Sequence, residues 1–221
     1  MKTETTLSRP VRIVVIGAGN RAHKYLEYAR RNPEQLRLAA IVEVNDLRRR
    51  AMADAFGLPD KYCYAHYDDF FAEGLDADMV LISTPENAHF DPAVKAIDAG
   101  YHVLLEKPIA QRLDECREIA RRARQRGVLV GVCHVLRYHP YFAKIRELVA
   151  SGRLGHVVSV NHTASVGLDR ATHSYVRGIF RRESEANPIL LAKCCHDIDF
   201  LLWLTGSHCR RLSSFGSLRW F

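Results

Sequence analysis

A glycine-rich turn near the N-terminus constrains the fold more than any other feature of this sequence. The turn, Gly17-Ala18-Gly19-Asn20-Arg21-Ala22, directly follows a continuous apolar run over residues 11–16. The segment after Asn20 repeats apolar side chains at helical spacing, namely Ala22, Tyr25, Leu26 and Ala29. A buried strand, a glycine turn and an amphipathic helix in this order form the first half of a βαβ unit.

The turn has the features of a dinucleotide-binding loop. Gly17 permits the tight turn, Gly19 lets the backbone approach a pyrophosphate, and Ala22 allows the helix to pack closely. The N–H groups at the start of the helix, near Asn20 and Arg21, can then bind the anion. Glycines also mark turns that bind nothing, so the glycines alone are weak evidence. The strand before the turn and the helix after it support the interpretation as a dinucleotide-binding loop. The pattern predicts a site for NAD or a related dinucleotide.

The alternation of apolar β-branched runs and helical patterns continues to about residue 132. This pattern is typical of repeated βαβ units and predicts a Rossmann domain, a doubly wound parallel sheet, over residues 1–132. The expected strands are residues 11–16, 36–44, 79–83, 102–105 and 128–132. The expected helices run from residue 20 to Asn32-Pro33 and over residues 46–56, 92–99 and 113–126.

A change in pattern after residue 132 predicts a second domain over residues 133–221. Pro140 can begin a helix that runs to about residue 150, and residues 197–204 suit a short helix closed by Gly206. Residues 157–164 alternate like a half-exposed antiparallel strand, and strand-like material begins again at residue 212. We therefore expect an α+β domain with an open, mostly antiparallel sheet that is incomplete, and a truncated chain.

Composition and charge narrow the classes of function. The chain is 48% hydrophobic and 26% charged, which is typical of a soluble globular protein. It has neither an apolar run long enough to span a membrane nor an apolar signal core, so a cytoplasmic location is expected. The net charge of +7 is spread over helix faces among acidic residues, which argues against nucleic-acid binding. The six cysteines lack CxxC spacing and are expected to be reduced thiols.

An acidic residue, Glu43, stands 26 positions after Gly17 near the end of the second expected strand. A carboxylate at this place can accept hydrogen bonds from the adenine ribose hydroxyls, which favours NAD over NADP. Arg48 and Arg49 follow closely and leave an alternative open, since either could hold the 2′-phosphate of NADP. A surface carboxylate with no ligand is a further alternative. NAD is the expected cofactor, with NADP as the alternative.

Further motifs follow in a defined order. They are Ser83-Thr84-Pro85-Glu86-Asn87-Ala88-His89, Glu106-Lys107-Pro108, Arg137-Tyr138-His139-Pro140 and Cys195-His196-Asp197-Ile198-Asp199. With these motifs the chain resembles the glucose-fructose oxidoreductase / inositol dehydrogenase / MocA family. The resemblance implies an NAD(P)-dependent oxidoreductase acting on a CH–OH group of a sugar, cyclic polyol or related small hydroxy compound. It also implies a homodimer or homotetramer formed through the C-terminal sheet, if that domain is complete.

The resemblance implies roles for residues after the third and fourth expected strands. Lys107 would lie at the nicotinamide edge, where a lysine can accept or relay the proton of a substrate hydroxyl. Glu106 would lie close to the cofactor, and the cofactor cleft would be lined by Ser83, Thr84, Pro85, Asn87 and His89. The position agrees with the general rule that open parallel sheets bind ligands beyond the carboxyl ends of their strands. A surface lysine before a turn proline is the alternative for Lys107.

A second set of candidates lies around His196. On the residues alone, His196 can simply cap or pack the expected helix that follows it, but the resemblance implies contact with substrate or an acid/base role. Many relatives carry an aspartate four residues before this histidine, where this chain has Ala192 followed by Lys193. Lys193 is therefore a further catalytic candidate, which could bind a substrate oxygen or belong to a different acid/base arrangement. Adjacent side chains such as Cys194 and Cys195 cannot easily converge on one tetrahedral ion, so no metal site is expected.

Two other functions stay open. One branch of this fold uses transient oxidation to cleave glycosidic bonds, so an NAD-dependent glycosidase is an alternative. The missing aspartate and the incomplete second domain also permit a non-catalytic protein that senses the cofactor or another ligand. Because function lies in sites placed on folds, the fold alone does not select the substrate.

Overall fold

The computed structural model describes residues 8–178, 180–182 and 186–217. The chain forms two compact units that divide between Cys133 and His134. Each unit has its own helices, and the strands of the described residues all belong to the first unit.

The first unit is built on a parallel sheet of six strands in the order β3-β2-β1-β4-β5-β6. The strands are β1 (Val11–Ile16), β2 (Leu36–Val42), β3 (Cys63–Tyr64), β4 (Met79–Ile82), β5 (His102–Leu105) and β6 (Val130–Val132). The last residue of β1, Ile16, pairs with Val42 of β2 and Ile82 of β4. The carboxyl ends of the strands therefore meet at one edge of the sheet. The strand order reverses between β1 and β4, the place where such sheets bind ligands.

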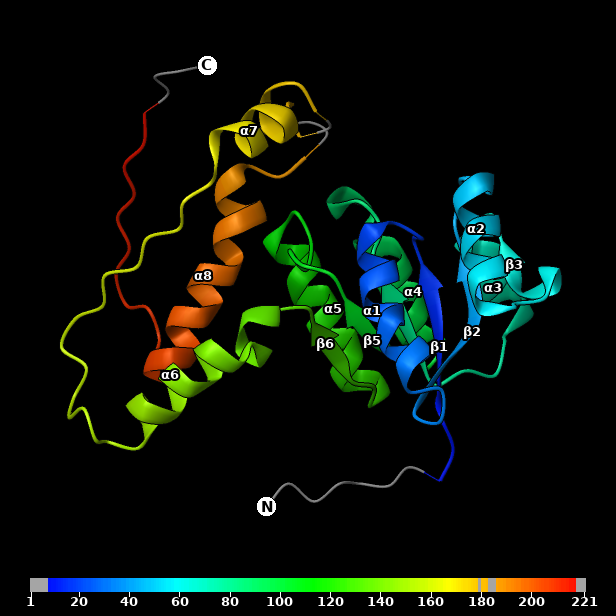
Figure 1. The fold of residues 1–221 in the computed structure, drawn as a ribbon, viewed down its shortest axis with the longest axis horizontal. Helices are drawn as coiled ribbons and strands as arrows, with labels where there is room; N and C mark the ends of the chain where they lie inside the picture. Colours follow the sequence, from blue (N-terminus) through cyan, green and yellow to red (C-terminus); the bar gives the residue numbers. More distant parts are fainter. Residues whose placement is uncertain (1–7, 179, 183–185, 218–221) are drawn as a thin grey trace. The chain divides into compact units, whose positions relative to one another are not determined.

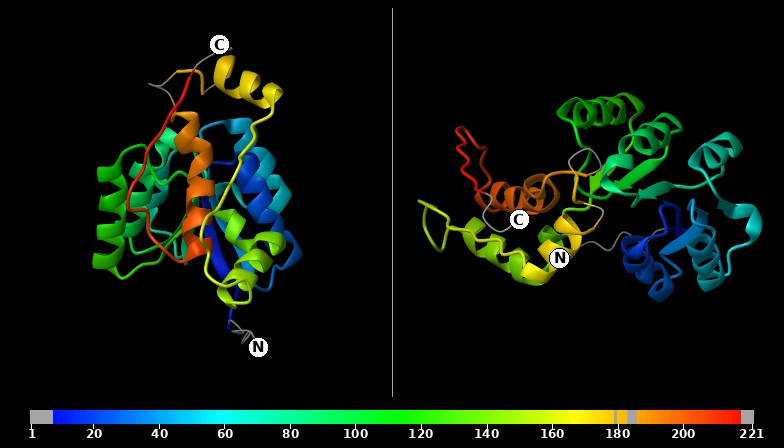
Figure 2. Two further views of the ribbon diagram at one scale, coloured as in Figure 1. Left: turned by 90° about the vertical axis from the view of Figure 1, so that its left-hand side faces the viewer. Right: turned by 90° about the horizontal axis from the view of Figure 1, so that it is seen from above.

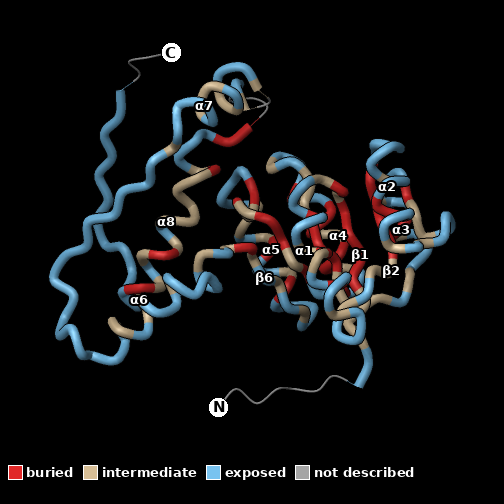
Figure 3. The backbone as a smooth tube through the Cα atoms, in the orientation of Figure 1, coloured by how far each residue is buried: buried red, intermediate tan, exposed pale blue. Residues whose placement is uncertain are grey.

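Helices cover both faces of this sheet (Figure 1 and the right-hand view of Figure 2). On one face, α1 (Asn20–Arg31) and α2 (Asp46–Phe56) bury Leu26 and Met52 against β1 and β2. On the other face lie α3 (Tyr67–Glu73), α4 (Phe90–Asp98) and α5 (Leu113–Arg126). Figure 3 shows that the buried residues gather in the strands and the helix faces toward them. The predicted doubly wound Rossmann sheet is confirmed.

Local sequence signals account for the helix ends that were predicted correctly. The α2 helix begins after Asn45, whose side chain accepts a hydrogen bond from the N–H of Arg48. It ends at Gly57, which has a left-handed φ of 59° that glycine adopts without strain. The expected bounds of α5 also match the structure, where Gly127 provides the same kind of stop.

The structure differs from the predicted elements between α2 and β4. The prediction missed β3 and α3, so the strand expected third in the sequence is the fourth. Because β3 contains only two residues, it has no apolar run to detect. The α3 helix spans only seven residues, which is too short to show a clear helical period. The predicted strands over residues 36–44 and 79–83 end earlier, at Val42 and Ile82, and β6 begins at Val130. The residues after Val42 and Ile82, among them Glu43, Val44 and Ser83, belong to the loops that form the candidate site.

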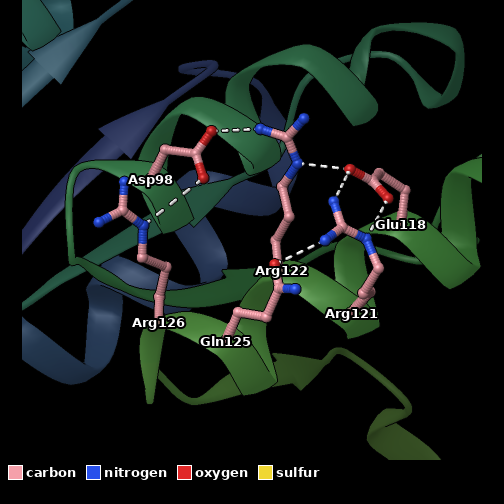
Figure 4. Close-up of polar contacts among 6 residues, drawn as sticks. All are labelled: Asp98, Glu118, Arg121, Arg122, Gln125 and Arg126. Atoms are coloured by element: carbon pink, nitrogen blue, oxygen red, sulfur yellow. Dashed lines mark hydrogen bonds and ion pairs between the residues drawn. The ribbon is translucent and has the colours of Figure 1, made fainter.

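An ion-pair network joins α4 to α5 on the surface of the first unit (Figure 4). The guanidinium of Arg122 binds both Asp98 of α4 and, through Nε at 2.6 Å, Glu118 of its own helix. Arg121 binds the same Glu118 carboxylate through two nitrogens, at 2.6 and 2.8 Å. Because several charges share partners, the network restrains the helices more than one isolated surface pair would.

The regular elements of the second unit, over its described residues, are helices and short turns. The unit contains α6 (Pro140–Ala150), α7 (Leu168–Ala171) and α8 (Ile189–Thr205), with short turns at Val135–Tyr138 and Thr172–Val176. Pro140 begins α6 as predicted. The last helix is much longer than the predicted one over residues 197–204, because it starts directly after Pro188. His196 consequently lies inside α8, which corrects the expectation that it precedes the helix.

The predicted strand over residues 157–164 is not formed. Residues 155–167 and 207–217 have no regular secondary structure and are almost entirely exposed (Figure 3). Val158, for example, is 95% exposed. A half-buried strand needs a neighbouring strand for its backbone hydrogen bonds, and the described part of this unit offers none. Part of the strand-like segment expected from residue 212 onward, residues 218–221, lies outside the described residues. No helix in the described ranges is long and apolar enough to cross a membrane.

Candidate functional site

The glycine turn packs tightly against the loop after β4. Gly17 has a φ of +95°, and a Cβ placed on it would lie 2.8 Å from the carbonyl carbon of Ser83. The Ser83 hydroxyl donates a 2.7 Å hydrogen bond to the carbonyl of Gly17. The left-handed conformation and the close contact both require glycine at this position. The turn is therefore fixed at the carboxyl ends of β1 and β4.

The second glycine of the turn meets a different environment. Gly19 has an ordinary φ of −77° as the N-cap of α1, and no heavy atom lies within 4 Å of where its Cβ would be. It provides no side-chain cap for the N–H groups at the start of the helix. Asn20 and Arg21 are exposed there, whereas Ala22 is fully buried against the sheet. Open space, helix N–H groups and the absence of a Cβ together fit the pyrophosphate of a dinucleotide.

Glu43 links two loops at the end of β2. One carboxylate oxygen accepts a hydrogen bond from the N–H of Ala18 at 2.7 Å, and the other accepts from the N–H of Asn45 at 2.9 Å. The residue is only 8% exposed, so these two hydrogen bonds compensate for much of its lost hydration. Each oxygen keeps a further lone pair for a ribose hydroxyl. Glu43 thus shapes the glycine turn in addition to facing the cavity beside it.

A cavity of about 400 Å³ opens between the glycine turn and the loops after β2, β3 and β4. Its walls include Glu43 and a set of residues from these loops, namely Gly17, Gly19, Val44, Arg48, Ala65, His66, Tyr67, Ser83, Thr84, Pro85 and Ala88. The rings of His66 and Tyr67 lie 4.3 Å apart between centroids. The sequence does not indicate these two residues, because the short strand β3 that precedes them has no detectable pattern. The cavity has the size and the polar and aromatic lining that suit a nucleoside.

The two arginines after Glu43 have different surroundings. The Arg49 guanidinium donates to the backbone carbonyl of Glu43 at 2.6 Å and to Asp46 at 2.7 Å, which leaves it half-buried. Arg48 is exposed, and its side chain forms part of the cavity wall. The structure thus separates two residues that the sequence could not distinguish.

His89 lies beneath the cavity loops rather than on the cavity wall. It is 1% exposed, and its ring nitrogens lie 2.8 Å from the carbonyl oxygen of Pro108 and 3.1 Å from that of Thr84. The imidazole therefore joins the loop after β4 to the loop after β5. Of the other residues expected in this region, Asn87 is exposed in the short turn Glu86–Ala88.

Glu106 and Lys107 follow β5 at the same edge of the sheet. Glu106 is 6% exposed and accepts a 2.6 Å hydrogen bond from the hydroxyl of Tyr25 on α1. Its other oxygen accepts from the backbone N–H of Lys107 at 3.0 Å, and Arg21 lies 3.8 Å away. Lys107 itself is half-buried. Tyr25 is a residue of this site that the sequence indicated only as part of an apolar helix face.

Lys193 and His196 lie on α8 in the second unit. The ring of His196 packs edge-to-face against His134, with centroids 5.8 Å apart, and Lys193 Nζ lies 6.0 Å from the centre of the Tyr175 ring. One turn after His196, Asp199 forms a two-hydrogen-bond pair with Arg137, at 2.6 and 2.8 Å. The motifs around Arg137 and His196 are therefore joined within this unit. Lys107 belongs to the other unit.

The described residues contain no group of three His, Cys, Asp or Glu side chains arranged to hold a metal ion. Each of the six cysteines is a free thiol. Cys133, at the end of β6, is buried, and burial raises the pKa of its thiol to about 11, so that it is uncharged at neutral pH.

Comparison with known proteins identifies the family. The family model described as "Oxidoreductase family, NAD-binding Rossmann fold" matches residues 11–134, which include the glycine turn, Glu43 and Lys107. The chain belongs to the Gfo/Idh/MocA family. A second family model, the Gfo/Idh/MocA C-terminal domain, matches residues 142–220. The first unit is thus the NAD-binding Rossmann domain of this family, as the motifs predicted.

The names of two of the similar proteins state an activity. A 1,5-anhydro-D-fructose reductase from Ensifer adhaerens is 32% identical over 126 residues, covering 57% of this chain and 37% of the relative. A D-xylose 1-dehydrogenase (NADP(+)) from Haloferax volcanii is 36% identical over 130 residues, covering 59% of this chain and 39% of the relative. This chain therefore matches about two fifths of the length of these relatives.

A solved structure shows the same fold. The WlbA dehydrogenase from Bordetella pertussis, in complex with NADH and UDP-GlcNAcA, superimposes with a TM-score of 0.76 at 21% identity. The superposition covers 89% of this chain and 57% of that chain.

Proposed function

We propose that the protein is an NAD(P)-dependent oxidoreductase that transfers a hydride between a nicotinamide cofactor and a CH–OH group. The observation that carries the cofactor part of this proposal is Gly19. Its φ is −77° and its missing Cβ has nothing within 4 Å, so neither backbone strain nor packing within the protein requires glycine. A ligand that approaches the backbone does require it. The pyrophosphate of the cofactor is that ligand.

The cofactor contacts of the proposal follow the strand ends. The glycine turn and the start of α1 hold the pyrophosphate, namely Gly17, Ala18, Gly19, Asn20, Arg21 and Ala22. Glu43 faces the adenine ribose at the cavity of about 400 Å³. The nicotinamide half extends toward Lys107 and Glu106 along the loop that contains Ser83, Thr84, Pro85, Asn87 and His89. His89 acts there by holding the loops, because it is almost fully buried.

The protein's own residues handle the proton and the substrate. The cofactor, when bound, supplies the hydride acceptor or donor. In the oxidation direction the substrate loses a hydride from carbon and a proton from oxygen, and we assign that proton to the Nζ of Lys107. His196 and Lys193 are the further residues to which we assign contact with the substrate, with His196 sharing the acid/base role. The ion pair between Arg137 and Asp199 holds α8, which contains His196 and Lys193, against the turn Val135–Tyr138.

The proposed substrate is a sugar, a cyclic polyol or a related small hydroxy compound. Support comes from the assigned relatives, a 1,5-anhydro-D-fructose reductase and a D-xylose 1-dehydrogenase. A compound of this kind presents several hydroxyl groups, and charged side chains such as those of Lys107 and Lys193 suit the binding of hydroxyl oxygens.

A panel of sugars and polyols, incubated with NAD or NADP, tests the activity through the absorbance of the reduced cofactor. We expect turnover with at least one compound and its loss in Lys107→Ala, while the variant still binds NADH. Turnover that survives this substitution would reject the role of Lys107. Cleavage of an aryl glycoside without accumulation of reduced cofactor would instead show an NAD-dependent glycosidase. Binding of NADH without turnover of any compound would indicate a sensing protein.

The second unit is the proposed place of assembly. The Gfo/Idh/MocA C-terminal model matches residues 142–220, and the exposed segments 155–167 and 207–217 belong to it. We propose that these segments enter an open antiparallel sheet through which the protein forms a homodimer or homotetramer. Light scattering at defined protein concentrations tests this assembly, and a monomer at high concentration would contradict it. The cytoplasmic location stays a prediction.

A further inference from the structure

A contact between Tyr25 and Glu106 joins two parts of the first unit that are far apart in the sequence. Tyr25 lies on α1, one and a half turns after the helix start, and its hydroxyl lies 2.6 Å from Oε1 of Glu106. The two residues are 81 positions apart. Glu106 is 6% exposed, so its carboxylate has little contact with water and depends on protein donors. The contact connects the proposed pyrophosphate-binding helix to the loop after β5.

The other oxygen of the same carboxylate fixes the backbone of Lys107. Oε2 of Glu106 accepts a hydrogen bond from the Lys107 N–H at 3.0 Å. The final torsion of a glutamate side chain is soft, so the direction of the carboxylate is set by its hydrogen-bond partners. With Tyr25 holding Oε1, Oε2 is directed at the Lys107 amide. Arg21 adds only a longer contact, at 3.8 Å to Oε1.

The surroundings of Tyr25 favour the neutral form of its hydroxyl. Burial, followed by hydrogen bonds to Cys133 and Glu106, raises the pKa of Tyr25 far above its ordinary value. The phenol therefore keeps its proton and donates it to the ionised carboxylate, which gives a short, charge-assisted hydrogen bond. Loss of that one hydroxyl removes a strong restraint without changing the packing of the ring.

We propose that Tyr25 is a positioning residue that acts through the Glu106 carboxylate to set the place of Lys107 relative to α1. This inference rests on the proposed function, in which α1 binds the pyrophosphate and Lys107 lies at the nicotinamide edge. One carboxylate then fixes the spacing between the pyrophosphate site and the nicotinamide edge. Small displacements of a reacting group cost large factors in rate, so such a restraint affects the chemical step more than binding.

Tyr25→Phe removes the hydroxyl alone, and Tyr28→Phe is its matched control. Tyr28 lies on the same helix, is 51% exposed and donates to Gln35 at the same distance of 2.6 Å. Amide hydrogen exchange, followed by NMR on the protein without ligands, reports the Lys107 N–H directly. The amide of Val103 in β5, bound to the carbonyl of Leu129 at 2.8 Å, reports the global stability of the sheet.

We expect the Lys107 amide to exchange about tenfold faster in Tyr25→Phe, since its acceptor has lost a charge-assisted partner. The Val103 amide should keep its rate in both variants, and Tyr28→Phe should leave both amides unchanged. Equal acceleration of Lys107 and Val103 would show a merely structural role and overturn the proposal. An unchanged Lys107 amide would overturn it as well. If Tyr25→Phe does not fold, Glu106→Gln replaces it, because the amide group cannot accept from both donors.

The second measurement separates catalysis from binding. In Tyr25→Phe, kcat with the best substrate of the panel should fall about tenfold, while the Kd for NADH stays within about twofold. The fall in kcat should persist at 10 °C. At this temperature a less stable variant is still folded, so a loss of stability alone does not lower kcat. Equal kcat in Tyr25→Phe and Tyr28→Phe would refute the positioning role. Absence of turnover in the wild type would refute the proposed function instead. The exchange measurement would still test whether the contact between Tyr25 and Glu106 restrains the Lys107 amide.

Discussion

The hydroxyl of Ser83 donates a 2.7 Å hydrogen bond to the carbonyl oxygen of Gly17. The Cβ that Gly17 lacks would lie 2.8 Å from the carbonyl carbon of the same serine. This relationship holds the glycine turn against the loop after β4, so both loops present their backbones to one cavity. It also distinguishes the two glycines of the turn, because the protein's own backbone geometry and packing require glycine only at Gly17.

Gly17→Ala should destabilise the fold. The substitution places a side chain at a φ of +95° and in contact with backbone atoms of Ser83 and Thr84. We expect the free energy of unfolding to fall by about 1–3 kcal/mol, as for other strained backbone positions. Urea denaturation measures this loss, and NADH titration should show weakened binding in the same variant. Unchanged stability would contradict the geometry described for the turn.

Glu43→Gln should also cost stability, because both carboxylate oxygens accept backbone N–H groups from Ala18 and Asn45. A glutamine amide presents an NH₂ group to one of these donors, which leaves a buried N–H without an acceptor. We expect a loss of about 1–3 kcal/mol in the free energy of unfolding. Glu34→Gln, at an exposed position after α1, is the control and should be neutral. Equal stability of the two variants would show that Glu43 is not a structural link.

Arg48 and Arg49 should differ in their effect on cofactor choice. Arg48 lies on the cavity wall, whereas Arg49 is held by Asp46 and the Glu43 carbonyl. If the protein binds NADPH, Arg48→Ala should weaken that binding roughly tenfold and NADH binding much less, since a charged hydrogen bond to phosphate is lost. Arg49→Ala should affect both cofactors alike. Fluorescence titration of both variants measures the ratio, and a selective effect of Arg49→Ala would contradict this assignment.

The ion-pair network between α4 and α5 predicts a pH dependence of stability. Hydrogen bonds from Arg121 and then Arg122 lower the pKa of Glu118 to about 2, from an ordinary value of 4.5. A depressed carboxyl pKa stabilises the fold above the unfolded-state pKa and loses this effect as the pH falls toward the folded-state pKa. The stability difference between wild type and Glu118→Gln should therefore shrink between pH 5 and pH 2. A constant difference in urea denaturation across this range would contradict the role of the network.

The sequence predicted the elements whose signals are local and repeated. The α2 and α5 helices carry an apolar face and end at Gly57 and Gly127, so their ends were correct to the residue. The two-residue strand β3 has no period to detect, because its pairing with β2 depends on tertiary contact. In the second unit, alternation over residues 157–164 predicted a strand that the described residues do not form. Alternation of apolar and polar residues indicates that one face of a segment is to be buried. It does not indicate which strand or helix buries that face.

The same limit applies to the site. Gly17 and Glu43 were found because they stand at or near the ends of predicted strands, and Lys107 was found through the family resemblance. The structure places all three at one edge of the sheet. His66 and Tyr25 were missed, since nothing in their sequence neighbourhood indicates the cavity wall or the Glu106 carboxylate. Contacts between residues this far apart in the chain become visible only in the folded structure.

NADH binding by the wild type and Gly19→Ala tests the central claim most directly. Gly19 has an ordinary φ and open space around its missing Cβ. The free energy of unfolding of the variant should therefore lie within about 1 kcal/mol of the wild-type value. We predict saturable binding of NADH to the wild type, followed by fluorescence, and at least roughly tenfold weaker binding to Gly19→Ala, because the methyl group occupies the place of the pyrophosphate. No saturable binding to the wild type, or equal binding to both proteins, would contradict the account.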